Sequence, residues 1–542
     1  MPSGQGDMTS QGRHSEFSLL YLLSVYYHCA GGSSKPSTRK ARKSASIPKL
    51  PSEFDLLIAA RKGALDQVEE LLLSFGDHVN VKDPVDGSTP LYNACDRGNT
   101  AIAVRLLQAN ADVNIATIYG VTPLMRASHK GYVDIVDELV TRSETQVDAT
   151  SESGFSALIY ASEHGHIAVV ERLIEHGAKV NKRTVYGATA LMRASCNGHA
   201  DIVERLLASG AEVNIQDGDG FNALIYASQK GHRGIVDRLL ASHAAVDTRN
   251  KEGYTPLMKA CTGGHSEVVQ RLLASGAQVN MRGNYGGTAL MDASKFGNED
   301  IVKMLLSAGA DTNISTKYGY TALIFACEKG YNTIVKRLLD SGAQVNACTE
   351  MGWTALMLSC NNSHEDTVMM LIAAGADPDK QNSYGVTALM FASSKGNESI
   401  VERLLAAGAN VNLKDNTEWT ALLRASKNGY YGIVDQLLSH GADMEMKDNR
   451  GRTALFRASV NGHKDIVETL IQSGADGSAS DNRGRTALFR ASVNGHVDVV
   501  HVLEKKLQGQ QDIERASSLK SNLSGEFDDP SVKREKVLDC GL

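Results

Sequence analysis

The sequence predicts an all-α protein in which short helix pairs stack into a solenoid. Three observations lead to this fold class. The chain has 542 residues, of which 42% are apolar, and that length exceeds what one hydrophobic core usually serves. One glycine recurs at intervals of 33 residues along most of the chain. Each interval also contains two short segments with the apolar spacing of an amphipathic helix.

The recurring glycine usually lies two residues before a threonine and four before a leucine. A single interval of 34 residues separates Gly120 from Gly154. Glu418 stands where the series lacks glycine, and a positive φ costs a residue with a Cβ about 1 kcal/mol. We therefore expect an altered turn at Glu418. The glycines are Gly87, Gly120, Gly154, Gly187, Gly220, Gly253, Gly286, Gly319, Gly352, Gly385, Gly451 and Gly484.

Each unit consists of a turn, a first helix and a second helix. Thr122 and Pro123 illustrate the start of a first helix, because threonine caps helices and proline suits the first helical position. Gly131 illustrates its end, since glycine adopts the left-handed C-cap conformation without steric cost. The second helix carries the spacing seen in residues 202–207, IVERLL. One pair cannot bury its apolar face alone, so the units must be stable as a stack.

The period, the turn, the Thr-Pro-Leu opening and the Gly-His between the helices resemble the ankyrin repeat. The resemblance covers about residues 51–508. It implies an ankyrin-repeat solenoid of helix-turn-helix units with β-hairpin loops, about 14 repeats including caps. The family histidine that bonds between turns is absent, so we expect packing to hold the turns in its place. Its slot holds Tyr92, Met125, Ile159, Met192, Ile225, Met258, Met291, Ile324, Met357, Met390, Leu423, Phe456 and Phe489.

The chain is expected to have three regions. Residues 1–50 and 509–542 lack the period and are rich in polar residues, so we expect disordered tails on either side of a solenoid over residues 51–508. Residues 53–80 resemble a degenerate first repeat without its opening turn, which is typical of a cap. Glu504, Lys505 and Lys506 bring charge to the last repeat, so we expect its outer face to be polar.

One apolar stretch bears on membranes: residues 17–27, FSLLYLLSVYY. It is shorter than the roughly 18 residues that a membrane-spanning helix needs. Asp7 and Glu16 precede it and no small-residue cleavage site follows, which argues against a signal peptide. We expect neither secretion nor anchoring, although a membrane contact through this stretch stays open. Eight cysteines without a CxxC pair favour free thiols, so we expect a cytoplasmic protein.

Catalytic and metal-binding motifs are missing from the sequence. It contains no P-loop, no HExxH and no GxSxG motif. A column of histidines shares one slot at about 9–10 Å spacing, whereas zinc ligands lie about 2 Å from the metal. We expect no catalytic site, no metal and no cofactor, and the net charge of -6 argues against nucleic acid. The histidines are His166, His199, His232, His265, His364, His463 and His496.

Two aromatic sets and one basic set are the candidate protein-binding residues, because the resemblance implies binding at hairpin tips and first helices. For the aromatic residues the alternative is packing on neighbouring hairpins. For the basic residues it is a solvated face multiplied by duplication. The first set, Tyr119, Tyr186, Tyr285, Tyr318 and Tyr384, precedes turn glycines; the second, Phe155, Phe221, Tyr254, Tyr320, Trp353 and Trp419, follows the turn position; the basic column is Arg424, Arg457 and Arg490.

The expected function is that of a non-catalytic scaffold or adaptor that binds other proteins on this face. The basic column adds the expectation of an acidic partner segment at the C-terminal repeats. The alternative is a regulatory or targeting subunit that anchors a complex, including at a membrane through residues 17–27. The fold does not identify the partner, because function on a shared fold depends on its sites.

Overall fold

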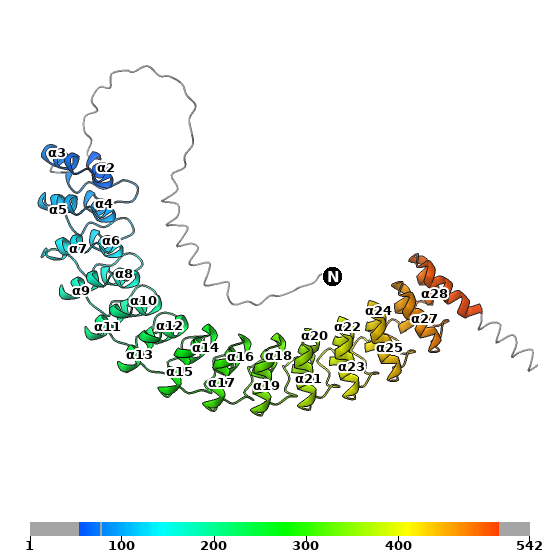
Figure 1. Ribbon diagram of the computed structural model, residues 1–542. Helices are drawn as coiled ribbons and strands as arrows, with labels where there is room; N and C mark the ends of the chain where they lie inside the picture. Colours follow the sequence, from blue (N-terminus) through cyan, green and yellow to red (C-terminus); the bar gives the residue numbers. More distant parts are fainter. Residues whose placement is uncertain (1–53, 76–77, 509–542) are drawn as a thin grey trace, which may run out of the picture. The chain divides into compact units, whose positions relative to one another are not determined.

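The computed structural model describes residues 54–75 and 78–508. Both expected tails, with the apolar stretch 17–27, lie outside the described residues. In the described part, helices alternate between two layers, with even-numbered helices in one layer and odd-numbered helices in the other (Figure 1). Within it no β-strand forms, and two isolated bridges join Cys348 to Thr354 and Ser480 to Thr486. The prediction of an all-α repeat solenoid is confirmed.

The even-numbered layer contains the first helix of every repeat. Its helices have seven or eight residues and all but the first begin after a hairpin turn. They are α2 Asp55–Lys62, α4 Pro90–Arg97, α6 Pro123–Lys130, α8 Ala157–His164, α10 Ala190–Asn197, α12 Ala223–Lys230, α14 Pro256–Gly263, α16 Ala289–Lys295, α18 Ala322–Lys329, α20 Ala355–Asn361, α22 Ala388–Lys395, α24 Ala421–Asn428, α26 Ala454–Val460 and α28 Ala487–Val493.

The odd-numbered layer contains the second helices. A further helical segment, residues 497–508, completes the last of fourteen pairs in the described part of the chain. The others are α3 Leu65–Phe75, α5 Thr100–Gln108, α7 Val133–Val140, α9 Ile167–Glu175, α11 Ala200–Ala208, α13 Arg233–Ala241, α15 Ser266–Ala274, α17 Glu299–Ser307, α19 Asn332–Asp340, α21 Glu365–Ala373, α23 Glu398–Ala406, α25 Tyr431–Ser439 and α27 Lys464–Gln472.

The first helices begin and end as their sequence predicts. The Thr122 hydroxyl accepts a hydrogen bond from the amide of Met125 at 3.3 Å, and Pro123 follows in the first helical position. Gly131 ends the same helix with a φ of 78°, in the left-handed region. Ser156 and Asn222 cap α8 and α12 in the same way. These caps satisfy amides that the first turn of a helix leaves without a partner.

The hydrophobic core runs from repeat to repeat without interruption. Each first helix packs against the first helices before and after it. Met125, Ile159 and Met192, from the slot where the family histidine is missing, are each 1% exposed. Every repeat thus provides half of two interfaces, and the stack is held by contacts between nearest neighbours.

The last repeat departs from this pattern. Phe456 in the preceding repeat is 2% exposed, whereas its equivalent Phe489 is 52% exposed because no further repeat follows it in the described residues. Val493 and Val497 are exposed as well. Glu504 and Lys505 are exposed as expected, but they do not make the whole outer face polar. The expectation of a polar face is therefore only partly correct.

The turn at Glu418 keeps the geometry of its neighbours, so the expectation of an altered turn was wrong. Glu418 has a φ of 62°, and its amide donates to the carbonyl of Asp415 at 2.8 Å. The Asp415 carboxylate also accepts from the amides of Thr417 and Trp419, at 2.7 and 3.0 Å. These bonds offset the cost of a positive φ at a residue with a Cβ.

Candidate interaction surface

Backbone hydrogen bonds join each hairpin to the next. The amide two residues before a turn glycine donates to the carbonyl of the residue just before the preceding turn glycine. Glu350 donates in this way to Tyr318 at 2.9 Å, and Asn416 donates to Tyr384 at 3.0 Å. This hairpin ladder, together with the buried apolar slot, holds the turns that lack the family histidine. It also fixes the backbone on which the first aromatic set is placed.

The first aromatic set is exposed along the hairpin tips. Its five members alone are called the tyrosine row below. Their rings are held on a regular backbone but are not covered by the neighbouring hairpins. Such large, partly apolar rings are the side chains that dominate protein-binding hot spots. The exposed fractions are 59% for Tyr119, 68% for Tyr186, 61% for Tyr285, 56% for Tyr318 and 55% for Tyr384.

The second aromatic set packs within the stack. Phe221 is buried and the other five residues are half-buried. Several of these rings lie against the first helix of their own repeat: Tyr320 stacks on Phe325 with 5.1 Å between ring centroids. Trp353 stacks on Phe391 of the next repeat at 4.8 Å. These contacts favour internal packing for this set.

Trp419 is held by cations from two repeats. The Arg457 guanidinium lies 4.1 Å from the centroid of its ring, and the Lys427 ammonium lies 5.6 Å away. A cation over an aromatic face is attracted by the negative charge of the ring face. The tryptophan thus contributes to the join between two repeats and keeps only part of its surface open to solvent.

Two members of the basic column are neutralised by buried aspartates. Arg424 pairs with Asp415, and Arg457 pairs with Asp448. The Asp448 side chain is fully buried and that of Arg457 is 12% exposed. The same aspartates accept amide hydrogen bonds in their hairpins, so each ion pair also ties a turn to the following first helix.

Arg490 differs from Arg457 although both lie in identical copies of the sequence DNRGRTALFRASVNGH. In the second copy Asp481 binds Arg485 of its own hairpin, at 2.6 Å, and not Arg490. That hydrogen bond lowers the pKa of Asp481 to about 2. The two arginines also differ in their neighbours in the preceding repeat: Trp419 receives Arg457, whereas Arg452 stands in the equivalent place for Arg490.

Sequence reasoning missed Asp292 on α16. It occupies the slot that holds Arg, Lys or an aromatic ring in most repeats, and burial raises its pKa to about 7 despite the nearby Lys259 and Lys295. Burial also lowers the pKa of Lys259, whose ammonium lies 4.1 Å from the ring centroid of Tyr254. The available signal was that Asp292 is the one acid in this sequence column.

The histidine column is structural, as expected. His199 reaches the carbonyl of Glu163 in the preceding repeat at 3.1 Å, and His265 reaches that of Gln229 at 3.0 Å. Among residues 54–75 and 78–508, no three His, Cys, Asp or Glu side chains are grouped to hold a metal. Cys261 and Cys327 are buried, and burial raises the pKa of both thiols.

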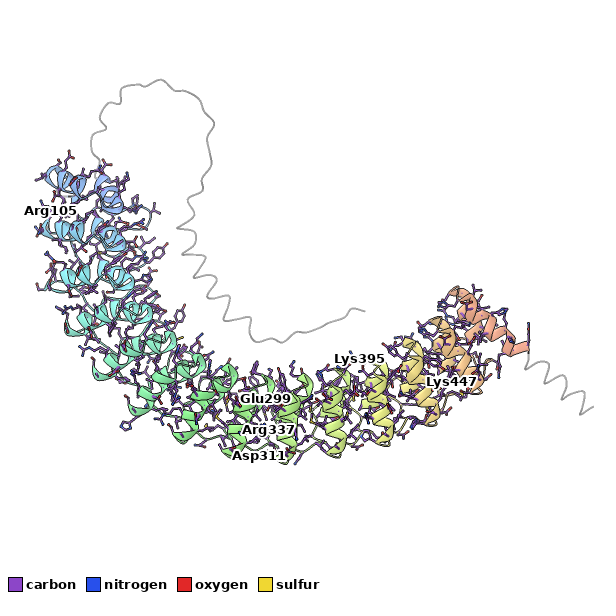
Figure 2. All side chains as sticks on the ribbon, in the orientation of Figure 1. Arg105, Glu299, Asp311, Arg337, Lys395 and Lys447 are labelled. Carbon is purple, nitrogen blue, oxygen red and sulfur yellow. The ribbon has the colours of Figure 1, made fainter. Side chains whose placement is uncertain are left out.

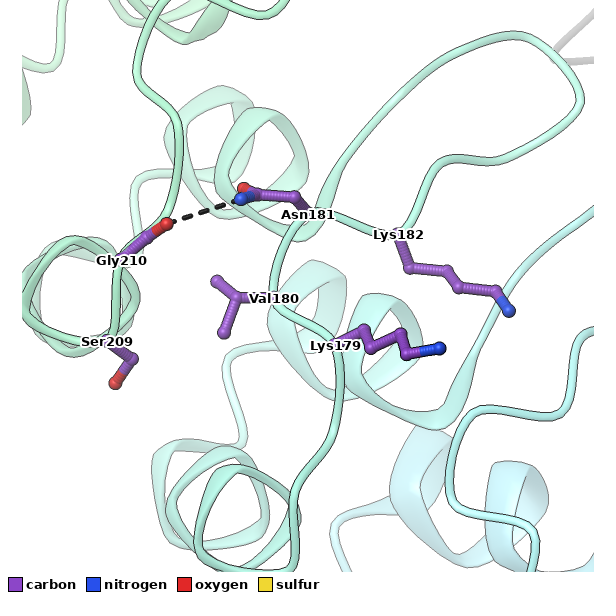
Figure 3. A pocket seen from close by; sticks show the side chains of 6 residues that line it. All are labelled: Lys179, Val180, Asn181, Lys182, Ser209 and Gly210. Carbon is purple, nitrogen blue, oxygen red and sulfur yellow. Dashed lines mark hydrogen bonds between the residues drawn. The ribbon is translucent and has the colours of Figure 1, made fainter.

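A depression in the described part of the stack is built around a hydrogen-bonded contact that recurs in other repeats. It is lined by Lys179, Val180, Asn181, Lys182, Ser209 and Gly210 (Figure 3). Asn181 donates to the Gly210 carbonyl at 3.2 Å and accepts from the Glu212 amide at 2.9 Å. Asn280 makes the same two contacts with Gly309 and Asp311. This pair of bonds, called the asparagine clip below, joins neighbouring repeats.

The charged side chains project from both layers (Figure 2). Glu299 and Arg337 lie on the second helices α17 and α19, whereas Lys395 ends the first helix α22. None of the described helices is long and apolar enough to cross a bilayer.

Family models match most of the chain. The model described as "Ankyrin repeats (3 copies)" matches residues 56–151, 129–217, 224–316, 290–382, 367–448 and 422–515. The model described as "Ankyrin repeats (many copies)" matches residues 197–240.

Curated relatives are similar over parts of the chain. "Putative ankyrin repeat protein YahD" of Escherichia coli (strain K12) is 33% identical over 26% of this chain and 88% of its own length. "NF-kappa-B inhibitor alpha" of Sus scrofa is 36% identical over 17% of this chain and 31% of its own. "Ankyrin repeat and KH domain-containing protein CBG24701" of Caenorhabditis briggsae is 33% identical over 24% of this chain, but the match spans only 5% of that relative.

Proposed function

The chain belongs to the ankyrin-repeat family, and on that premise we propose that it is a non-catalytic scaffold or adaptor that binds other proteins through its hairpin tips. The observation that carries this proposal is the tyrosine row. Its members stand on a backbone fixed by the hairpin ladder, and each is more than half exposed.

The chemistry of the row supports protein binding. Tyrosine offers a large apolar ring and a hydroxyl at low cost in conformational entropy, since it has only two side-chain torsions. Ile118 and Val185, beside Tyr119 and Tyr186, are 56% and 63% exposed. A partner that covers these side chains removes apolar surface from water at several points along one line, and the contributions add.

The comparisons support binding at the level of the family. The name of the Sus scrofa relative describes an inhibitor of NF-kappa-B, which is a role exercised on another protein. We carry over only the general role, because the match covers 31% of that relative. The partner of this chain is a separate proposal.

The basic column supports an acidic partner segment at the last repeats. Arg424 and Arg457 are already paired with aspartates. Arg490 has no carboxylate within 4 Å among the described residues, and the same holds for the exposed Arg450 and Arg483. Guanidinium groups that have no carboxylate partner within the protein can bind the carboxylates of another segment strongly. We propose that these three, and not the whole column, contact the acidic segment.

We also place the protein in the cytoplasm. The described cysteines are all free, including the exposed Cys348, which suits a reducing compartment.

Affinity capture with a paired variant tests the function. Tyr285→Ser with Tyr318→Ser removes two neighbouring rings of the row, and both positions are exposed enough for the fold to tolerate the change. Tyr431→Ser is the control, because Tyr431 is 49% exposed but begins α25 in the other layer. We expect partners held by wild type and by the control to be lost from the paired variant. Identical sets of captured proteins from all three would contradict the proposal.

A further inference from the structure

The last repeat leaves an apolar and basic face uncovered. Phe489 and Val493 are four residues apart on α28 and therefore lie on one side of it, with exposed fractions of 52% and 59%. Val497, at the start of the following helix, is 76% exposed. In earlier repeats the next helix pair covers the slot of Phe489, as the 2% exposure of Phe456 shows. An apolar patch of this kind marks a binding surface.

Arginines border this patch. Arg490 lies beside Val493 on α28, three residues away, and Arg483 is exposed in the hairpin that precedes the helix. Neither guanidinium has a carboxylate within 4 Å in the part of the chain that the structure describes. We call Arg483, Phe489, Arg490, Val493 and Val497 the terminal face. Its occupant must offer an apolar side chain flanked by carboxylates.

We propose that the terminal face binds a segment of this same chain, residues 526–529, whose sequence is Glu-Phe-Asp-Asp. Phe527 covers the apolar patch, and the carboxylates on either side of it meet Arg483 and Arg490. Outside the described residues, this is the one place where three carboxylates fall within four positions. Its ring and charges match the face in kind.

The connecting chain is long enough for this contact. Residues 509–525 separate the last described residue, Gln508, from Glu526. At about 3.3 Å per extended residue they reach roughly 55 Å. The helix over residues 497–508 is about 18 Å long, so the terminal face lies well within that reach. A tether of this length holds the segment at an effective concentration on the order of millimolar, which makes even a weak contact populated.

The contact regulates the last repeats. While residues 526–529 occupy Arg483 and Arg490, these arginines are closed to an acidic partner segment, and a partner must displace the chain's own segment. The inference goes beyond the proposed function and does not depend on the tyrosine row, so either can fail alone.

Hydrogen exchange on the full chain tests the contact. The variant E526Q/D528N/D529N removes three charges outside the described residues and leaves the sequence of all the described helices unchanged. We expect amides of residues 487–500 to exchange several-fold faster in this variant than in wild type, with residues 454–460 of the preceding repeat unchanged. The reversal R483E/R490E should have the same effect, and D528R/D529R added to it should restore slow exchange.

A peptide probe gives a second measurement. A fluorescein-labelled peptide of residues 520–532 should bind the charge-removed chain about tenfold more tightly than wild type, whose face is already occupied. The same peptide with its three acids amidated is the control. Equal exchange at residues 487–500 in wild type and the charge-removed variant would overturn the inference. The inference would also be overturned if the protection of residues 487–500 were lost on dilution and sedimentation showed a dimer, because the face would then bind a second copy of the chain.

Discussion

At the scale of single residues, the two identical sequence copies act as an internal experiment. Arg457 and Arg490 have the same neighbours along the chain, yet only Arg457 reaches the aspartate of its own hairpin. Arg457 also has a partner one repeat away, where its guanidinium lies over the ring of Trp419. A side chain in a stack therefore takes its role from the neighbouring repeat as much as from its own.

The Arg457 pair should be costly to break. In Asp448→Asn the amide oxygen still accepts the hairpin hydrogen bonds, but the nearly buried guanidinium loses its counter-charge. We expect a loss of about 3 kcal/mol. Asp481→Asn is the matched control, and it should cost less because Arg485 is 26% exposed and can turn to water. Denaturant unfolding measures the free energy of unfolding of both variants. Equal losses would contradict the claim that burial of the Arg457 pair makes it costly to break.

Asp292 should make stability depend on pH. Its pKa is raised by burial to about 7 in the folded chain, above its ordinary value near 4. The folded state thus holds a proton that the unfolded state releases, and stability falls as pH rises from about 4 through 7. Asp292→Asn should remove this loss, with a gain of roughly 2 kcal/mol at pH 8 after allowance for partial exposure. Thermal unfolding at pH 5 and pH 8 checks it: the gain of the variant should be clearly larger at pH 8 than at pH 5.

At the scale of elements, the hairpins show how a repeated turn tolerates an exception. The bond from the hairpin after Glu418, from Asn449 to Thr417, is 3.2 Å, at the long end of the ladder. Lys414 lies 3.6 Å from the Glu418 carboxylate and offsets its charge.

Exchanging glycine and glutamate between neighbouring turns measures that cost. Glu418→Gly should stabilise the chain by about 1 kcal/mol, because glycine adopts a positive φ without steric strain. Gly385→Glu should destabilise it by more, since a Cβ there would lie 2.7 Å from Asn416 Oδ1 and 2.8 Å from its amide nitrogen. Amide exchange of the two hairpins is the measurement: it should become slower in Glu418→Gly and faster in Gly385→Glu.

The elements were predictable from the sequence because their causes are local. The glycine period, the threonine caps and the apolar spacing depend on residues within one unit. The division of the aromatic residues into exposed and packed side chains was not predictable from the sequence. Tyr318 and Tyr320 are the same residue type and differ only in lying before and after the turn glycine. The pairing of Arg457 was hidden for the same reason: its partner and its aromatic contact come from different repeats.

At the scale of the whole molecule, stability is carried from repeat to repeat. Within residues 54–75 and 78–508, the main contacts of each helix pair are with the pairs before and after it. Local damage should therefore divide the chain into two independently stable parts and not unfold it all at once.

Leu305 in α17 provides the test. It is fully buried, so Leu305→Ala should cost about 3 kcal/mol and uncouple the repeats on either side. We expect hydrogen exchange under mild denaturant to show faster opening of α16 to α19, with the outer repeats still protected. Leu306→Ala is the control, because Leu306 is only half-buried. A single concerted loss of protection along the chain would contradict the nearest-neighbour description.

The asparagine clips carry a mechanical consequence. Clips occupy many of the joins, and at others an acid such as Asp148 or Asp379 makes only the bond to the amide. The joins follow one another in series along the line of pulling. Tension applied to the two ends is then borne by every join at once and yields at the weakest, while the others stay closed. Stretching would release the chain in equal steps of roughly 100 Å, one 33-residue unit at a time. A molecule with this behaviour gives way gradually under load and re-forms from whichever units remain.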